Sequence, residues 1–258
     1  MYMEWGFSDN SVRFYSTETR KQIGLFEHLH IGQLSSALFT DSKTLVTAGT
    51  DCTVAVWTLV DSGKSVELHP RATLFGHRKP VSVLAISRSF NALLSASTDG
   101  QVMLWDLNRC EFNRMLADAL PVTCATINDV TGNIVLCHDH EISVYSLNGD
   151  RLLRQDSGDC LQESIISCAC YQGAGNEWLE RDLVFTGHKR GQVRIWSKVV
   201  RGGHFELELI RQLNHADSSR DDGANVNAGI TCILPMPQVV YTGDEDGRVY
   251  EWNCVQRH

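Results

Sequence analysis

Several features that mark other classes of protein are missing from this 258-residue chain. It has no C-x-x-C pair and no N-x-S/T acceptor site, and its nine cysteines are an odd number, which indicates reduced thiols and a cytoplasmic setting. No apolar run approaches the roughly 20 residues that a helix needs to cross a bilayer. The first residues, MYMEWGFSDN, match neither a signal peptide nor a transit peptide. We therefore expect a cytoplasmic protein without direct membrane insertion.

Catalytic motifs are missing as well. The chain contains no G-x-S-x-G, H-E-x-x-H or G-x-G-x-x-G, which leaves hydrolase, zincin and dinucleotide-binding interpretations without support. The run Gly63-Lys64-Ser65 is only the tail of a phosphate-binding loop, because Thr58 stands where that motif needs its first glycine. The formal charge of -8 argues against nucleic acid, which requires clustered Lys and Arg. We predict no enzyme activity, no cofactor, no metal and no nucleic-acid partner.

What the chain does contain is a repeat of a tight turn, an alternating strand and an aromatic residue. A unit of this kind cannot bury its apolar face alone, so the repeat predicts units that stack on one another. The six copies are DNSVRFY (9–15), DCTVAVW (51–57), DGQVMLW (99–105), DHEISVY (139–145), RGQVRIW (190–196) and DGRVYEW (246–252).

The third copy supplies the template for one unit. Short strands are predicted over 81–86, 93–97, 101–105 and 111–116, with turn residues between them. Four-stranded antiparallel sheets that recur about every 40 to 45 residues are typical of a propeller. The predicted fold is therefore all-β, a β-propeller with six recognisable blades that form part of a seven-bladed ring.

The repeat extends over nearly the whole chain, so we expect residues 1–258 to form a single propeller domain. Only eight residues precede Asp9 and six follow Trp252. The first blade is therefore expected to lack its innermost strand, and the last blade most of its outermost strand. On this basis the chain is interpreted as the C-terminal part of a longer protein.

The third unit resembles the WD-repeat family in its Gly76-His77 pair, its Asp99-Gly100 turn and its Trp105-Asp106 dipeptide. In that family the turn Asp, the Gly-His histidine, a strand Ser or Thr and the strand Trp form a buried hydrogen-bonded set that stabilises each blade. The resemblance implies that Ser95 or Ser97 supplies the hydroxyl in this unit. It implies structural roles for His77, Asp99 and Trp105 here, for His28, Asp51 and Trp57 in the second unit, and for Asp246 and Trp252 in the sixth.

Four longer segments, at 5–15, 121–135, 203–215 and 228–252, resemble the C-terminal propeller of BEACH-domain proteins, with the fungal beige-like members most similar. This resemblance covers essentially the whole chain. It implies a non-enzymatic scaffold in vesicle, vacuolar and lysosomal trafficking and in autophagy. The implied partners are other proteins or peptides and the upstream BEACH and pleckstrin-like domains of the parent protein, through which the chain would lie peripherally on endomembranes.

Candidate partner-binding residues lie in loops and turns. Trp178 sits in an insertion over 172–181, and Trp and Arg are enriched among interface hot spots. Arg78, Lys79 and Arg190 fall at equivalent blade ends, where they are predicted to receive an acidic peptide. The competing interpretations are that Trp178 packs on its own blade and that the cations form a solvated rim.

Four further motifs are interpreted as structural. The triplet 138–140 is read as a turn rather than a metal site, and 217–223 as an acidic loop rather than a calcium loop, because the ligand spacing is absent. The Gly187-His188 pair is interpreted as an inter-strand turn. Cys168 and Cys170 alternate onto one strand face and are expected to pack in the core.

Two other functional hypotheses stay open. A substrate-receptor subunit of a ubiquitin ligase would carry Trp-Asp-x-Arg at a strand end, whereas the chain reads Trp105-Asp106-Leu107-Asn108. A propeller enzyme would need convergent acidic or His side chains at a central channel.

Overall fold

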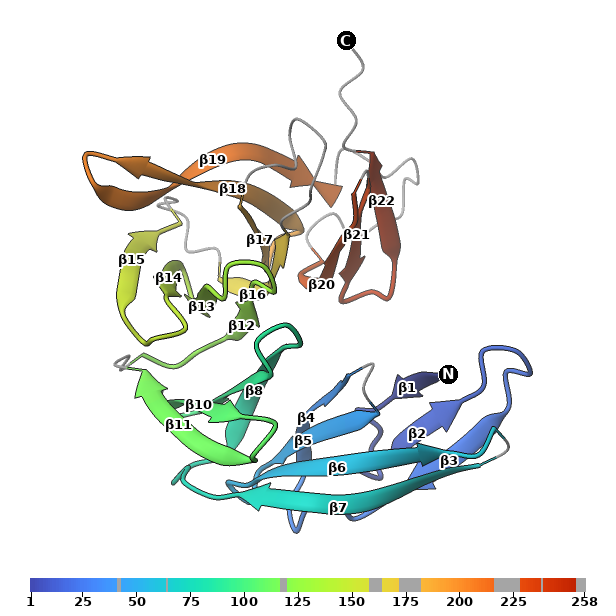
Figure 1. The fold of residues 1–258 in the computed structure, drawn as a ribbon. Helices are drawn as coiled ribbons and strands as arrows, with labels where there is room; N and C mark the ends of the chain where they lie inside the picture. Colours follow the sequence, from blue (N-terminus) through green and yellow to red (C-terminus); the bar gives the residue numbers. More distant parts are fainter. Residues whose placement is uncertain are drawn as a thin grey trace. The chain divides into compact units, whose positions relative to one another are not determined.

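In a computed structural model, the structure describes residues 1–40, 43–63, 65–116, 120–157, 164–171, 182–215, 228–237 and 239–253. These residues form 22 strands in six separate antiparallel sheets (Figure 1). The sheets follow one another along the chain, and we number them as blades 1 to 6. The predicted all-β organisation in six blades is confirmed. The blades divide between two compact units, Met1–Pro121 and Val122–His258.

Unit 1 contains blades 1 to 3, and its strands pair in chain order within each blade. Blade 1 has three strands among the described residues, whereas blades 2 and 3 have four. The strands are β1 (Tyr2–Glu4), β2 (Val12–Tyr15) and β3 (Gln22–Phe26) in blade 1, β4 (Leu34–Phe39), β5 (Thr44–Gly49), β6 (Val54–Asp61) and β7 (Val66–Leu74) in blade 2, and β8 (Val81–Ser87), β9 (Ala92–Ser97), β10 (Val102–Asp106) and β11 (Glu111–Leu116) in blade 3.

Unit 2 contains blades 4 to 6, again with strands paired in chain order. Its strands are β12 (Cys124–Ile127), β13 (Ile134–His138), β14 (Glu141–Tyr145) and β15 (Arg151–Asp156) in blade 4, β16 (Ile165–Tyr171), β17 (Leu183–His188), β18 (Gln192–Arg201) and β19 (His204–Asn214) in blade 5, and β20 (Ile230–Pro235), β21 (Val239–Asp244) and β22 (Val249–Asn253) in blade 6.

Blade 3 shows why the sequence pattern was informative. Each of its four strands begins and ends within one residue of the range predicted from the repeat. All six residues of β9 are buried, whereas β11 is mostly exposed. A strand inside the sheet whose side chains are buried on both faces reads as a continuous apolar run, whereas an edge strand is exposed to solvent.

Hydrophobic cores lie between facing blades rather than inside one sheet. In unit 1, Val46 and Val56 of blade 2 pack in one cluster with Leu84, Leu93 and Trp105 of blade 3. Each such side chain contributes about 1.5 to 3 kcal/mol when fully buried. Two analogous clusters in unit 2 join blade 4 to blade 5 and blade 5 to blade 6. The blades of each unit are therefore stabilised by their neighbours.

Polar contacts also join blades 4 and 5. The Gln155 side-chain Nε2 donates to the Leu207 carbonyl at 2.8 Å, and the Leu207 N–H donates to Gln155 Oε1 at 2.9 Å. Asp182 Oδ2 lies 2.6 Å from Lys198 Nζ, and Asp182 Oδ1 accepts from Asn128 Nδ2 at 2.8 Å. Asp182 and Lys198 are both mostly buried. The polar side chains at the interface between these two blades are therefore paired with each other or with the backbone.

The hairpin of β18 and β19 is the longest in the described residues, with strands of 10 and 11 residues. Its turn is Gly202-Gly203, with φ of 57° and 85°. That left-handed region favours glycine. A Cβ at either position would meet nothing within 4 Å.

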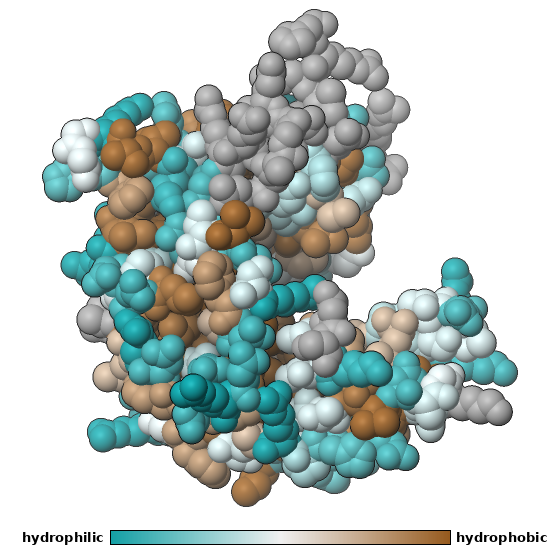
Figure 2. Space-filling model, viewed as in Figure 1, coloured by the Kyte–Doolittle hydropathy of each residue, from teal (hydrophilic) through white to brown (hydrophobic). Residues whose placement is uncertain are grey.

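The surface is mostly hydrophilic, with scattered apolar side chains. On the face drawn in Figure 2, outside the grey residues, these side chains lie in separate groups. Ile31 and Phe75 of unit 1 are the most exposed apolar examples near a groove, at 101% and 72%. Among the described residues, no helix has the length and apolar character needed to cross a membrane.

Candidate functional site

The end of blade 3 carries a continuous chain of hydrogen bonds. Trp105 Nε1 donates to Ser95 Oγ at 2.8 Å, and Ser95 Oγ lies 2.7 Å from His77 Nε2. On its other side, His77 Nδ1 lies 3.1 Å from Ser97 Oγ, which donates to Asp99 Oδ1 at 2.6 Å. The structure therefore brings His77, Asp99 and Trp105 together, with both serines as intermediates rather than one.

The direction of this chain is fixed by its carboxylate end. Asp99 can only accept, so Ser97 donates its single proton to Asp99 and accepts from His77 Nδ1–H, and Nε2 of the neutral imidazole then accepts from Ser95. His77 is then the neutral Nδ1–H tautomer. Burial lowers the pKa of His77, and the hydrogen bond from Ser97 lowers the pKa of Asp99. A buried network in which every group is satisfied fixes the turn in one orientation.

Blade 2 has a similar arrangement in which the imidazole contacts the carboxylate directly, and it corrects one prediction. His30, not His28, lies 3.1 Å from Asp51 through its Nδ1 atom and 2.8 Å from Thr47 Oγ1 through its Nε2 atom. Trp57 Nε1 donates to the same Thr47 hydroxyl at 2.9 Å. His28 is exposed and has a φ of 56°. The prediction selected His28 because residues 25–28 (LFEH) resemble residues 74–77 (LFGH) of the third unit. In the structure it is the imidazole two positions later that lies close enough to the turn to contact Asp51.

Blade 6 corrects a second prediction. His215 Nε2 lies 2.8 Å from Thr242 Oγ1, which accepts from Trp252 Nε1 at 2.8 Å. The carboxylate beside His215 belongs to Asp244, whose Oδ2 is 3.7 Å from Nδ1, and not to Asp246, which is exposed. Asp244 occupies the register position of Ser97 in blade 3, and its carboxylate faces the imidazole at a separation longer than a hydrogen bond. Burial lowers the pKa of His215.

Blade 5 builds its network from a different histidine. Trp196 Nε1 donates to Thr186 Oγ1 at 2.9 Å, and Thr186 Oγ1 lies 3.0 Å from His188 Nε2. His188 ends β17 and is fully buried, so it supplies a hydrogen-bonded imidazole from within the strand. In blades 2, 3, 5 and 6 the bridging hydroxyl stands ten residues before the Trp. That constant spacing is the signal that would have selected Ser95 over Ser97 as the partner of Trp105.

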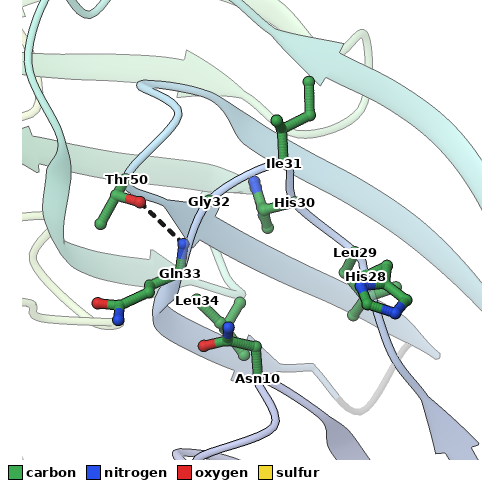
Figure 3. Close-up of a pocket in the computed structure, with 9 residues that line it drawn as sticks. All are labelled: Asn10, His28, Leu29, His30, Ile31, Gly32, Gln33, Leu34 and Thr50. Carbon is green, nitrogen blue, oxygen red and sulfur yellow. Dashed lines mark hydrogen bonds between the residues drawn. The ribbon is translucent and has the colours of Figure 1, made fainter.

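The network holds a connecting loop that exposes apolar and basic residues. His77 is buried and tied to β9, whereas its neighbours Phe75, Arg78 and Lys79 are exposed. Phe75 and Ile31 line one groove of about 460 Å³ in unit 1, together with Trp57. The residues 28–31 that form one wall of this groove also line a second one, of about 390 Å³, shown in Figure 3. There the Gln33 N–H donates to Thr50 Oγ1 at 2.8 Å and holds the loop against the turn of blade 2.

Arg78 and Lys79 are exposed beside Phe75 but line neither groove. Arg190 is exposed in the turn between β17 and β18, in unit 2. Trp178 lies outside the residues that the structure describes. The proposed roles of Arg78, Lys79, Arg190 and Trp178 in binding stay predictions.

Unit 2 contains a group of three thiols. The sulfur atoms of Cys124, Cys137 and Cys168 all lie within 4.8 Å of one another. Hydrogen bonds from the thiols of Cys137 and Cys168 lower the pKa of the Cys124 thiol, while donating to Cys124 raises the pKa of Cys137. The sequence predicted Cys168 as a core residue, and it does pack on the cluster between blades 4 and 5. Its approach to two other thiols was not predicted.

Comparison with known proteins places this geometry in a family. The family model of the "WD domain, G-beta repeat" matches residues 68–106, from within β7 to the end of β10. Beige protein homolog 1 of Schizosaccharomyces pombe is 29% identical over 271 residues, which cover 97% of this chain. WD repeat- and FYVE domain-containing protein 4 of Homo sapiens is 34% identical over 278 residues, also 97% of the chain. The chain is a WD-repeat β-propeller related to BEACH-domain proteins.

Further matches agree with this assignment. BEACH domain-containing protein A2 of Arabidopsis thaliana is 34% identical over 203 residues, or 77% of this chain. The crystal structure of the computationally designed Ika8 protein superimposes with a TM-score of 0.65 at 20% identity, covering 97% of this chain and 70% of that one, which supports the fold. The WD-repeat chain spans only 10% of the fission yeast relative, 9% of the human one and 6% of the plant one. WD-repeat propellers of this kind are protein-interaction domains.

Proposed function

We propose that this WD-repeat propeller is a non-enzymatic platform that docks other proteins during vesicle and lysosomal or vacuolar trafficking. The Lysosomal-trafficking regulator of Homo sapiens, whose name states such a role, is 22% identical over 260 residues that cover 97% of this chain and 6% of that protein. The chain then acts in the cytoplasm, peripherally on endomembranes, through its partners or a parent protein.

The observation that carries this proposal is the anchored loop between β7 and β8. The buried His77 anchors this loop to blade 3. Phe75 is 72% exposed, and Arg78 and Lys79 are exposed beside it. A loop that is already anchored loses less conformational freedom on binding, which favours affinity. An apolar residue next to two cations, on a chain with a net charge of -8, matches a peptide that carries an apolar anchor and acidic residues.

Proximity labelling in fission yeast tests the proposal. The chain is fused to a biotin ligase and compared with the variant F75D/R78E. Its matched control is R88E/F90D, which changes the same residue types in the exposed turn between β8 and β9, at the opposite end of blade 3. We expect endomembrane-trafficking proteins to be enriched by the wild type and the control and lost from F75D/R78E.

Other outcomes reject parts of the proposal. Equal labelling by all three proteins excludes the β7–β8 loop as the docking site. If a W178A variant has wild-type stability but no longer labels these proteins, the docking site lies in the insertion that contains Trp178. Enrichment of a cullin adaptor in place of trafficking proteins favours the ubiquitin-ligase receptor.

A further inference from the structure

The three thiols of unit 2 are placed by two different features of the fold. Cys124 and Cys137 are register partners on β12 and β13, so their side chains share one face of blade 4. Cys168 lies on β16, the first strand of blade 5, and packs on the cluster that contains Cys137. A cross-strand pair from one blade therefore meets a single thiol from the next, and the three sulfur atoms converge within 4.8 Å.

This spacing is close to that of a three-coordinate metal–thiolate site. A metal–sulfur bond of about 2.3 Å, repeated three times in one plane, places the sulfurs about 4 Å apart. The observed sulfurs need to move together by less than about 1 Å to reach that separation. Thiolate donors select soft ions such as Cu⁺ and Zn²⁺, and a buried apolar shell shields the bonds from water.

The surroundings are suitable for such a site. Cys137 is fully buried, and Cys124 and Cys168 expose only a small part of their surface, so the three thiols are largely shielded from solvent. Val135, Ile165 and Trp196 belong to the apolar cluster around it. The geometry points to Cys124, Cys137 and Cys168 as a binding site for one thiophilic d¹⁰ metal ion, either three-coordinate Cu⁺ or Zn²⁺ with water as its fourth ligand. Binding displaces the thiol protons: one ion and three thiols give the tris-thiolate complex and three protons, without oxidation or reduction.

The test uses the full 258-residue chain in a C160S/C254S background, which removes the thiols outside the described residues. The reduced, metal-free protein is titrated with ZnCl₂ in one arm and with Cu⁺ in the other, in competition with a chromophoric chelator. We expect one equivalent to bind, the Tm to rise, and proton release to follow the titration. The arm with the tighter competition constant identifies the ion.

The C168S variant removes one ligand, and C170S is its matched control. Cys170 lies two residues further along β16, packs on the same cluster and is outside the group of three. We expect C168S to weaken binding by more than about 100-fold, because loss of even an outer-shell partner costs about 10- to 100-fold. C170S should bind within a factor of about 3 of the unmodified background. Equal affinity of C168S and C170S overturns the proposal.

A second measurement needs no substitution of the three cysteines, so it tests the site even if C168S does not fold. Alkylation is carried out in moderate urea, where transient opening of the fold makes buried thiols reactive. One equivalent of metal should slow the alkylation of Cys124, Cys137 and Cys168, as mapped by mass spectrometry, while the exposed Cys232 reacts at an unchanged rate. Protection of all four thiols, or of none, contradicts a specific site.

Discussion

Removal of the Ser95 hydroxyl is the most direct test of how a blade is held. Ser95 Oγ accepts from Trp105 Nε1 and lies 2.7 Å from His77 Nε2, so S95A leaves two buried polar atoms without this partner. A buried group without its hydrogen bond costs about 1 to 3 kcal/mol. The variant should therefore lose about 2 to 6 kcal/mol of unfolding free energy, a large share of the roughly 5 to 15 kcal/mol typical of native proteins.

Urea denaturation followed by tryptophan fluorescence measures this loss. The control is S82A, because Ser82 is exposed and its hydroxyl donates only a long 3.4 Å bond to the Ala96 carbonyl. S82A should stay within about 0.5 kcal/mol of the wild type.

A double-mutant cycle separates the network from simple loss of packing. W105F removes the indole donor, so S95A/W105F leaves only the imidazole without its bond. The double variant should cost less than the sum of the single variants by about 1 to 3 kcal/mol. Strict additivity, or an S95A protein as stable as S82A, would refute the directional network.

Three further predictions concern other parts of the chain. H30A should lower the unfolding free energy by about 1 to 3 kcal/mol in urea denaturation, whereas H28A should stay within about 0.5 kcal/mol; the reverse order would restore the original assignment. Because burial lowers the pKa of His77 in the folded state, the unfolded chain takes up a proton that the folded chain does not as pH falls through about 6.5. Stability should therefore fall between about pH 7 and pH 5, and a denaturation series of H77N with the wild-type slope would exclude this cause. D182A leaves the mostly buried Lys198 unpaired and should cost about 3 to 5 kcal/mol, whereas D182A/K198M should recover part of that loss; equal midpoints for both variants would contradict the pairing.

The strands of the WD-repeat propeller could be predicted closely from the sequence. Their apolar runs and turn residues depend on local periodicity, so β8 to β11 were placed within one residue at each end. Periodicity also identified the Trp that closes most units. The choice of Ser95 was left open because it depends on which side chain faces the indole across the sheet.

The corrected assignments, His30 in place of His28 and Asp244 in place of Asp246, show the limit of aligning repeats by sequence similarity alone. His30 reaches the turn of blade 2 from a connecting loop, and loops vary in length, so it lies two positions after the predicted His28. In blade 6 the carboxylate nearest the imidazole is Asp244, two positions before the predicted Asp246. What recurs in both blades is the contact between the histidine and the strand threonine, and not the sequence position of every member.

The thiol group could not be predicted from spacing at all. Cys124 and Cys137 are separated by a strand and a turn, and Cys168 belongs to another blade. Only the register of β12 with β13, and the packing of β16 on that blade, bring the three sulfurs together.

The Gly202-Gly203 turn at the end of the β18–β19 hairpin has a practical use. Both glycines have room around them, and the adjacent Arg201 makes an exposed ion pair with Glu208. Short peptide epitopes or fluorophore-acceptor sequences can be spliced there at little cost to the sheet, because loop closure becomes only slowly less favourable with length. This position provides an attachment point for imaging the protein in cells, on a blade separate from the β7–β8 loop that we propose as the docking site.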